Sequence, residues 1–507
     1  MNLERRQVSQ SIEGWAARLR QVSRLMLGNA FSSLRPSREA FRVVRFLVAV
    51  LATLAALPLA AQAVTATGPL RVCEKNPRYF TDGSGKGVYL TGSHTWNNLV
   101  DMGLTDPPPP FDFPRYLDWV QKLNHNFMRM WTWESATWDT RDVYEPFGPK
   151  KEVHSASPQP YARTGPGNAL DGKPKFDLKK FNQDYFDRMR SRVSAAREKG
   201  IYVSVMLFEG WGLQFAQGAW EGHPFNRENN VNGIDGDLNG DGKGLDIYTL
   251  ASPAITALQE AYVRKVIDTV NDLDNVLYEI SNENHPPSSQ WQYHMIDFIH
   301  KYEKGKPKQH PVGMTFQYQG GKNSTLFESP ADWVSPNPDG GYRDDPPAAD
   351  GRKVVLNDTD HLWGIGGNQA WVWKSFLRGH NPIFMDPYEG EVLGSRSDPK
   401  FDPVRRSMGY TLKLAKRMNL VDMVPRSDLS SAQYCLANPG SEYLVYLPSG
   451  GTAAVDLSAA SGALAVEWFN PTTGETVKDK ETAGGDRRDF TAPFSGDAVL
   501  YIFGSKK

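Results

Sequence analysis

The chain has 507 residues, which is enough for more than one domain, and its 57 basic and 58 acidic side chains leave a formal net charge of −1. This balance argues against a nucleic acid or an anionic membrane as a partner, because both attract a basic surface. The two cysteines, Cys73 and Cys435, are too few for a disulfide-rich scaffold. The sequence leaves open whether they pair across a domain junction.

An apolar segment near the N-terminus predicts export. Residues 46–63 follow Arg42 and Arg45 and end in Ala-Gln-Ala, the pattern of a bacterial signal peptide that is cleaved after Ala63. The alternative is a membrane anchor, because the apolar run reaches the short end of the range for a membrane span. The long stretch before it is unusual for a signal peptide and would be explained by translation from Met26. We therefore predict a secreted protein, periplasmic or extracellular, and exclude residues 1–63 from the fold.

Between residues 64 and 424, short apolar runs alternate with helical patterns. The predicted strands lie at 88–92, 127–131, 202–208, 275–281, 311–316, 331–335, 353–357 and 382–385. The predicted helices lie at 113–124, 177–200, 255–270, 288–303, 368–378 and 403–417. The nearly continuous apolar run at 202–208 is typical of a parallel strand buried on both faces. This count and alternation predict an α/β fold, a (β/α)8 TIM barrel, rather than an open sheet.

After residue 425 the pattern changes. Short apolar strands are separated by Gly, Pro, Asn and Ser, and no helical periodicity is visible. Such a run predicts a small all-β sandwich domain at 425–507. The expected organisation is therefore a signal segment at 1–63, a barrel at 64–424 and a sandwich at 425–507.

Polar and aromatic side chains follow most of the predicted barrel strands. In a (β/α)8 barrel the active site lies at these C-terminal strand ends. The candidate substrate-binding or catalytic residues are His94, Trp96, Asn97, Arg129, Trp133, Glu134, Glu209, Asn282, Glu283, His285, Tyr318, Asp358, Asp360, His361 and Trp363. No Gly-rich phosphate loop and no His-x-x-x-His zinc pair accompanies them. This inventory favours a neutral, polyhydroxylated substrate.

Two carboxyl groups on facing strands suit one reaction in particular. Hydrolysis of a glycosidic bond needs a carboxylic acid that protonates the leaving oxygen and a second carboxylate on the other side of the sugar. Glu283, after the fourth strand, is the candidate acid, and Asp360 or Asp358, after the seventh, is the candidate second group. The two aspartates share a face if the strand continues that far. The alternative for Glu283 is a helix N-terminal residue that only favours the helix dipole.

Other charged residues at this end have competing interpretations. Glu209 either contacts a sugar or pairs with a cationic side chain. Arg129 is predicted to orient carboxylates rather than to bind an anionic substrate. Glu279, which lies in the middle of a strand, is predicted to form an ion pair inside the barrel.

The pair Asn282-Glu283 in the segment YEISNEN resembles the Asn-Glu pair of the clan A glycoside hydrolases. The resemblance implies that Glu283 is the acid/base and that Asn282 binds the sugar 2-hydroxyl. In that clan the nucleophile is usually a Glu at the end of the seventh strand, where this sequence has TDHLWG and no Glu. Asp360 corresponds to it by position, with Asp358 next. This departure leaves the nucleophile and the stereochemistry open.

A second resemblance covers nearly the whole chain after the signal segment. The segments VYLTGSHTWNNL, YEISNEN and VEWFNPTTGE resemble bacterial apiosidase-like barrel proteins. Their tail module is often labelled a collagen-binding domain. The resemblance implies a glycosidase, and we expect the tail to brace the barrel or to bind glycan rather than collagen.

One acidic loop follows the third strand. Asp235, Asp237, Asn239 and Asp241 stand at alternate positions, and Asp246 takes the twelfth. The spacing matches an EF-hand calcium loop, except that Asp replaces the bidentate Glu and no helix pair flanks it. A structural calcium ion is one expectation and a polar turn is the other. No cofactor is expected for catalysis.

These features together predict a secreted glycoside hydrolase, retaining by expectation, that acts on a plant or microbial polysaccharide. A carbohydrate is the expected partner, and neither a nucleic acid nor, after signal cleavage, a membrane is expected. One alternative is a barrel that binds carbohydrate without catalysis. Another is an adhesion protein that acts through residues 425–507.

Overall fold

The computed structural model describes residues 65–139, 153–390, 394–395 and 398–504. The predicted signal segment lies outside these residues. Within the described part of the chain, no helix is both long enough and apolar enough to cross a membrane.

Parallel strands form one eight-stranded sheet in the order β3-β15-β14-β13-β12-β11-β10-β5. The strands are β3 (Gly92–His94), β5 (Phe127–Met130), β10 (Tyr202–Glu209), β11 (Val276–Asn282), β12 (Val312–Thr315), β13 (Trp333–Ser335), β14 (Val354–Asp358) and β15 (Asn381–Met385). The two edge strands meet where the Asn126 N–H donates to the Thr91 carbonyl at 3.0 Å. Gly92 permits this approach, because a Cβ there would lie 2.1 Å from the Phe127 carbonyl oxygen. The predicted (β/α)8 barrel is confirmed.

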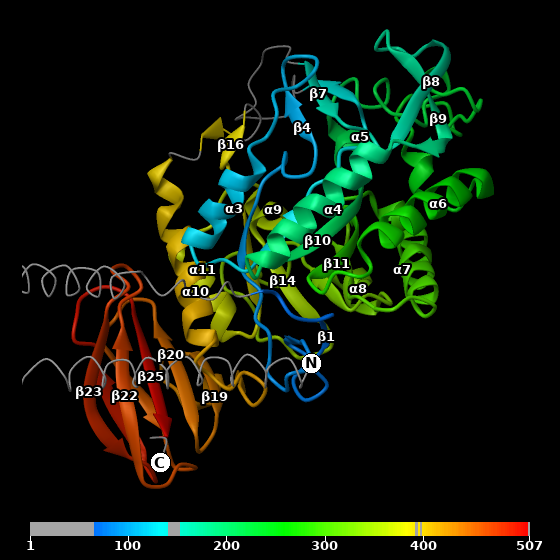
Figure 1. Ribbon diagram of the computed structural model, residues 1–507. Helices are drawn as coiled ribbons and strands as arrows, with labels where there is room; N and C mark the ends of the chain where they lie inside the picture. Colours follow the sequence, from blue (N-terminus) through cyan, green and yellow to red (C-terminus); the bar gives the residue numbers. More distant parts are fainter. Residues whose placement is uncertain (1–64, 140–152, 391–393, 396–397, 505–507) are drawn as a thin grey trace, which may run out of the picture. The chain divides into compact units, whose positions relative to one another are not determined.

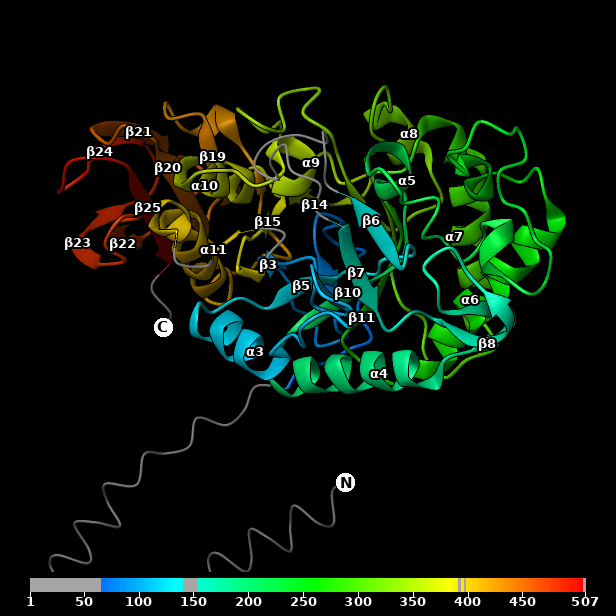
Figure 2. The same cartoon turned by 90° about the horizontal axis from the view of Figure 1, so that it is seen from above.

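Helices surround this sheet, as Figure 2 shows for α3, α4, α6 and α7. The helices are α3 (Phe113–Lys122), α4 (Gln183–Glu198), α5 (Gly212–Phe215), α6 (Pro253–Val270), α7 (Ser289–Glu303), α8 (Asn323–Glu328), α9 (Thr359–Trp363), α10 (Gln369–Leu377) and α11 (Asp402–Ala415). In α3 the side chain of Asp112 caps the first turn by accepting from the Arg115 N–H at 3.1 Å. The same helix buries Tyr116, Leu117 and Val120 against the barrel, as its apolar periodicity predicts.

Two predicted boundaries are wrong. The first barrel strand was expected at 88–92, but Val88 instead bridges the antiparallel Phe80, and only Gly92–His94 pairs with β15. The second predicted helix was expected to begin at Asp177, but Asp177 lies in strand β9 (Pro174–Phe181) opposite Ala162. Phe176, Asp177 and Leu178 are all buried in this strand. The helix begins only after its cap Asn182.

The barrel carries several smaller β elements. They are β1 (Arg71–Val72), β2 (Phe80–Thr81), β4 (Asp101–Gly103), β6 (Thr137–Asp139), β7 (Val153–Ser157), β8 (Tyr161–Asn168), β9, β16 (Glu389–Gly390) and β17 (Gly394–Ser395). Strands β4, β7 and β6 form a three-stranded sheet, and β8 and β9 form a hairpin. Figure 1 shows both groups beyond one end of the barrel strands.

The C-terminal region is all β, as predicted. An antiparallel six-stranded sheet has the order β18-β19-β20-β25-β22-β23, and β21 pairs with β24. The strands are β18 (Val424–Pro425), β19 (Tyr434–Asn438), β20 (Glu442–Leu447), β21 (Thr452–Asp456), β22 (Ala463–Phe469), β23 (Thr476–Ala483), β24 (Arg487–Thr491) and β25 (Ala498–Gly504). Trp468 and its apolar neighbours fill the core between the layers.

The sheet packs against helices of the barrel. One hydrophobic cluster joins Trp373 and Phe376 of α10 to Tyr446, Phe469 and other residues of the sheet. At its margin the Gln369 amide donates to Asp497 at 2.8 Å. Cys73 and Cys435 are both buried and unpaired, so no disulfide crosses this junction.

Candidate active site

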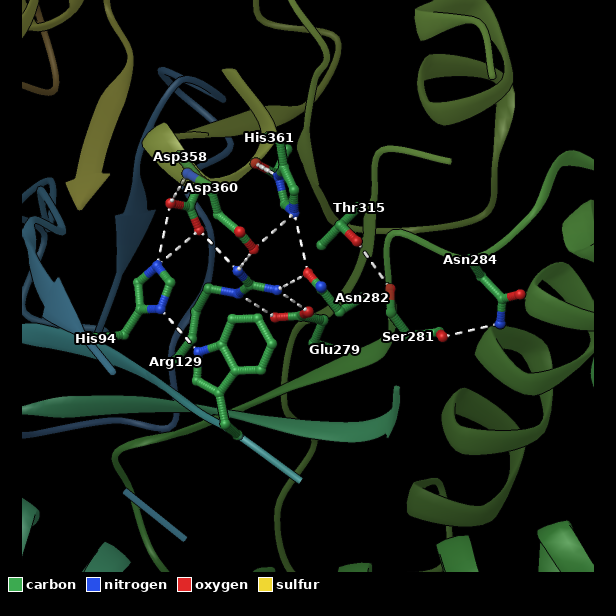
Figure 3. A network of polar contacts seen from close by, with 12 residues as sticks. His94, Arg129, Glu279, Ser281, Asn282, Asn284, Thr315, Asp358, Asp360 and His361 are labelled. Carbon is green, nitrogen blue, oxygen red and sulfur yellow. Dashed lines mark hydrogen bonds and ion pairs between the residues drawn. The ribbon is translucent and has the colours of Figure 1, made fainter. Parts of the chain in front are cut away.

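Arg129 is the centre of a buried ionic network at the C-terminal end of the barrel (Figure 3). Its Nε and Nη2 donate to Glu279 at 2.9 and 2.5 Å, and Nη2 also donates to Asn282 at 2.6 Å. Its Nη1 donates to Asp358 and to Asp360, both at 2.9 Å. Burial lowers the pKa of the guanidinium, but the surrounding carboxylates raise it further, so Arg129 stays charged. One side chain from the second strand thereby holds groups from the fourth strand, the seventh strand and α9.

Asp358 is fully engaged by protein groups. It ends β14, and its oxygens accept from Arg129 at 2.9 Å, from His94 Nε2 at 3.1 and 3.0 Å, and from the Asp360 N–H at 3.0 Å. His94 Nδ1 accepts from the Trp131 indole at 2.8 Å, so the ring proton of His94 lies on Nε2. Burial alone would raise the pKa of Asp358, but His94 and Arg129 outweigh it and hold the pKa below its usual range.

Asp360 has a different environment two residues later. The strand ends at Asp358, and Asp360 lies in the first turn of α9, so the two aspartates do not share a strand face. Burial and the charge of Asp358 raise the pKa of Asp360 to about 6, against the effect of Arg129. One oxygen of Asp360 accepts from Arg129, and no hydrogen bond from the described residues reaches the other. This second oxygen is therefore open to a ligand.

Asn282 and His361 form the next part of the network. His361 Nε2 lies 3.2 Å from the Asn282 Oδ1, and its Nδ1 lies 2.7 Å from the Ser335 hydroxyl. Burial and the charge of Arg129 lower the pKa of His361 to about 3, so the ring is neutral. It then donates from Nε2 and accepts from Ser335 at Nδ1. Because the Asn282 oxygen accepts from both Arg129 and His361, its amide nitrogen faces away from them and can donate to a ligand.

Glu283 follows β11 directly and is 6% exposed. Burial, together with the negative charges of Asp360, Asp358 and Glu209, raises the pKa of Glu283 well above the usual value, whereas Arg129 opposes this shift. Both effects, burial and the negative charges, favour the protonated form of the Glu283 carboxyl group. A buried carboxyl group whose pKa is raised is suited to donate a proton to a substrate.

Glu209, at the end of β10, is a third carboxyl group at this end of the barrel. Its Oε1 accepts from the Gly212 N–H at 2.7 Å, which caps the short helix α5. Burial and the nearby Glu134 and Asp360 raise the pKa of Glu209 to about 8. Glu134 in turn accepts from the Glu209 N–H at 2.7 Å and from Tyr248 at 2.6 Å. Both glutamates therefore have structural partners, and no salt bridge of Glu209 is seen among the described residues.

Several predicted sugar contacts are buried among other side chains. His94 is 0% and Trp133 is 1% exposed, and Trp133 stacks on Trp138 at 4.9 Å. Trp96 lies among Trp131, Trp133, Trp138 and Trp211 in the same aromatic cluster. These three residues have protein partners in the structure, and their contact with a sugar stays a prediction. Their burial follows from packing between distant strands, which a strand-end pattern does not contain.

The remaining predicted residues lie nearer the surface. Tyr318 is 36% exposed, lies edge-on to Phe215 at 4.8 Å, and has its pKa raised by burial and by Glu283. His285 and Asn97 are half-buried, and Trp363 packs against Trp371 at 5.4 Å.

Two residues that complete the network had no predicted role. Trp131 directs the His94 proton, and Ser335 directs the His361 proton. Each stands at or just after the end of a barrel strand, so a search of every strand end for hydrogen-bonding side chains would have included both.

Among the described residues, Asp358, Asp360 and His361 form the one group whose possible metal-ligand atoms lie within 4.8 Å of one another. Arg129 contacts both of these carboxylates at 2.9 Å and already supplies the positive charge, so the group does not suit a metal ion.

The predicted calcium loop shows a different pattern. Asp237 accepts from the backbone N–H groups of Asp241 and Gly242, and Asp246 accepts from those of Leu238 and Asn239. Asp235 accepts from Asp237 N–H at 3.2 Å. In this arrangement the carboxylates stabilise the turn itself. Calcium binding stays a prediction, which the change in melting temperature on replacing EDTA by calcium would test.

Comparisons with known proteins agree with this fold. A family described as "Domain of unknown function (DUF6298)" matches residues 150–319, and one described as "Putative collagen-binding domain of a collagenase" matches residues 422–502. No curated protein matches the chain. A glycoside hydrolase family 5 structure from Bacteroides vulgatus is 14% identical, with a TM-score of 0.58 over 86% of this chain and 94% of its own. A second structure from this organism, titled a putative glycoside hydrolase, is 13% identical, with a TM-score of 0.57 over 86% of this chain and 82% of its own. At these identities the likeness establishes the barrel fold and its β extension.

Proposed function

We propose that the protein is a secreted glycoside hydrolase in which Glu283 is the acid/base and Asp360 is the second carboxylate. The observation that carries the proposal is that two carboxyl groups at one end of the barrel have different pKa values. The pKa of Glu283 is raised well above its usual value, whereas Asp360, with a pKa of about 6, is ionised at neutral pH beside Arg129. Two carboxyl groups in complementary protonation states are what glycosidic hydrolysis requires. The solved glycoside hydrolases of the same fold support this reading by analogy.

Asp358 is unsuited to be the reacting group, because both of its carboxylate oxygens already accept hydrogen bonds from protein groups. His94, Arg129 and a backbone N–H occupy Asp358, which is 0% exposed. Asp360 is 8% exposed and keeps one oxygen without a partner among the described residues. We therefore assign the reaction to Asp360 and assign to Asp358 the placement of Arg129 and of the α9 turn.

In the proposed retaining reaction, Glu283 gives its proton to the glycosidic oxygen as Asp360 attacks the anomeric carbon and the leaving group departs. The Glu283 carboxylate then takes a proton from water, and the water oxygen displaces Asp360 from the sugar. In the inverting alternative, Asp360 would instead deprotonate a water that attacks directly. The configuration of the first-formed product sugar, followed by proton NMR, distinguishes the two.

The test of the proposed function is hydrolysis of a panel of plant and microbial polysaccharides by the wild type, Glu283→Gln and Asp360→Asn. Loss of the acid is expected to lower turnover by about 10²- to 10⁴-fold. Equal turnover by the wild type and Glu283→Gln would refute the acid/base assignment. Glycan binding without turnover by any of the three would favour a carbohydrate-binding barrel instead.

We further propose that the C-terminal sheet braces the barrel. The cluster around Trp373 and Phe469 buries one face of the sheet against α10 and α11, and Gln369 bonds Asp497 beside it. A surface that is buried in this way is not available to collagen or to a glycan. Binding of the full chain to collagen through the other face would contradict this role.

A further inference from the structure

The backbone at Glu283 has an unusual conformation. Its φ is +43°, in the left-handed region that residues other than glycine seldom adopt. Such a conformation is unfavourable for a residue with a side chain, so it persists only where the surroundings hold it. Glu283 follows the last strand residue, Asn282, and the left-handed turn sets the direction in which its carboxyl group leaves the strand.

Three successive carbonyl groups at this turn each accept a hydrogen bond. The Asn282 carbonyl accepts from the Gly210 N–H at 3.0 Å, and the Asn284 carbonyl accepts from the Tyr318 N–H at 3.1 Å. Both of those donors belong to the backbone. The Glu283 carbonyl accepts from the Gln214 side-chain amide at 2.8 Å, and this is the one side-chain donor among the three.

Gln214 is itself held in place. It lies in α5, and its Nε2 also donates to the Gly210 carbonyl at 2.8 Å, so one amide group links the turn after β10 to the turn after β11. The two turns are in close contact, because a Cβ at Gly210 would lie 2.5 Å from Cγ of Asn284. Asn284 is 0% exposed and donates to the Ser281 hydroxyl at 2.9 Å, a contact drawn in Figure 3.

We propose that Gln214 is a positioning residue for the catalytic acid. By bonding the Glu283 carbonyl, it holds the left-handed backbone and so aims the carboxyl group that protonates the leaving oxygen. The inference rests on the proposed function of Glu283. The Gln214 amide makes its hydrogen bonds to main-chain carbonyl groups, so it acts through the main chain.

The test uses three variants of the full chain. Gln214→Met keeps the length of the side chain but removes both N–H donors. Gln214→Glu keeps the shape and can donate only when its carboxyl group is protonated. Gln121→Met is the matched control, because Gln121 is exposed on the outer helix α3.

Two substrates distinguish impaired proton donation by Glu283 from a general loss of activity caused by a disturbed structure. One is the glycan that the wild type hydrolyses, whose sugar leaving group needs a proton. The other is the dinitrophenyl glycoside of the same sugar, whose leaving group departs without one. Gln214→Met is expected to lower kcat/KM on the glycan by about ten- to a hundredfold and to lower that on the dinitrophenyl glycoside far less. A merely structural role would lower both alike. Relative to the wild type at the same pH, Gln214→Glu should regain activity on the glycan as the pH falls, and Gln121→Met should match the wild type.

A crystal structure of Gln214→Met gives a readout that is independent of activity. The expected result is that Glu283 leaves the left-handed region. Unchanged Glu283 backbone in this variant, or an unchanged kcat/KM on the glycan, would overturn the inference. If the wild type hydrolyses no glycan, the proposed function fails, whereas the crystal structure still decides whether Gln214 sets the backbone at Glu283.

Discussion

The indole N–H of Trp131 donates to Nδ1 of His94 at 2.8 Å, which places the ring proton on Nε2 and directs it to Asp358. Without this donor the ring can carry its proton on Nδ1, and Asp358 then loses a hydrogen bond in a fully buried position. A histidine in the wrong tautomer strongly impairs a catalytic network.

Trp131→Phe is therefore expected to lower kcat by about ten- to a hundredfold through loss of one buried hydrogen bond and the tautomer it selects. The matched control is Trp138→Phe, because Trp138 is also 1% exposed but its indole nitrogen has no hydrogen-bond partner among the described residues. Steady-state kinetics of both variants checks this prediction. Equal losses in the two would show that indole packing, and not the hydrogen bond, is what matters.

The pH dependence of kcat/KM should be bell-shaped, because the proposed reaction requires an ionised Asp360 and a protonated Glu283. The acid limb is expected near pH 6, since the pKa of Asp360 is raised to about 6. The alkaline limb follows the loss of the Glu283 proton, whose pKa is raised well above its usual value. Because the two carboxyl groups interact, the apparent pKa values of the two limbs belong to the pair and not to either residue alone.

Measured on a dinitrophenyl glycoside, kcat/KM of Glu283→Gln should lose the alkaline limb and keep the acid limb. A profile that retains both limbs would assign the alkaline limb to another group.

Glu209 should make the folded state less stable as the pH rises. Its pKa is about 8 in the folded protein against an ordinary value of 4.5, so between these values the folded state binds the extra proton. The free energy of unfolding then falls with rising pH, by at most about 1.4 kcal/mol per pH unit from this one group. The stabilisation that the Glu209 proton gives is complete below pH 4.5, the ordinary pKa of the group, and is lost above about pH 8.

Glu209→Gln should remove that part of the pH dependence and raise stability at pH 8 relative to the wild type. Urea unfolding at a series of pH values measures both curves. Parallel curves for the two proteins would mean that Glu209 is ionised in the folded state throughout.

The contact between the barrel and the C-terminal sheet should make the two regions unfold together. Phe469 is 4% exposed. The centre of its ring lies 5.6 Å from that of Trp373 of α10 and 5.2 Å from that of Tyr410 of α11. Phe469→Ala is expected to destabilise the whole protein by about 3 to 5 kcal/mol, the usual cost of such a cavity. Differential scanning calorimetry should show one transition that moves as a unit. Two transitions, with only the smaller one shifted, would contradict the bracing role.

Local features of the sequence were enough to predict the barrel strands, the all-β tail and Glu283 at a strand end. Apolar runs and helical stripes are short-range patterns, and a barrel with a known active-site face places each strand end without further information. The misplaced start of α4 has the same origin, because Asp177 is a suitable helix N-cap by residue type alone, whereas in the structure it pairs with Ala162 of β8.

Only the tertiary structure gave grounds to propose Asp360 rather than Asp358 as the second carboxylate. The same holds for the burial of Trp133 and for the hydrogen bond from Gln214 to the Glu283 carbonyl. Each depends on which donors reach a given atom and how much water is excluded from it. Those donors come from strands far apart in the chain: Arg129 from the second, His94 from the first and Gln214 after the third. Hydrogen bonding and desolvation act over a few ångströms in space, whatever the separation in sequence, so residue spacing along the chain could not decide them.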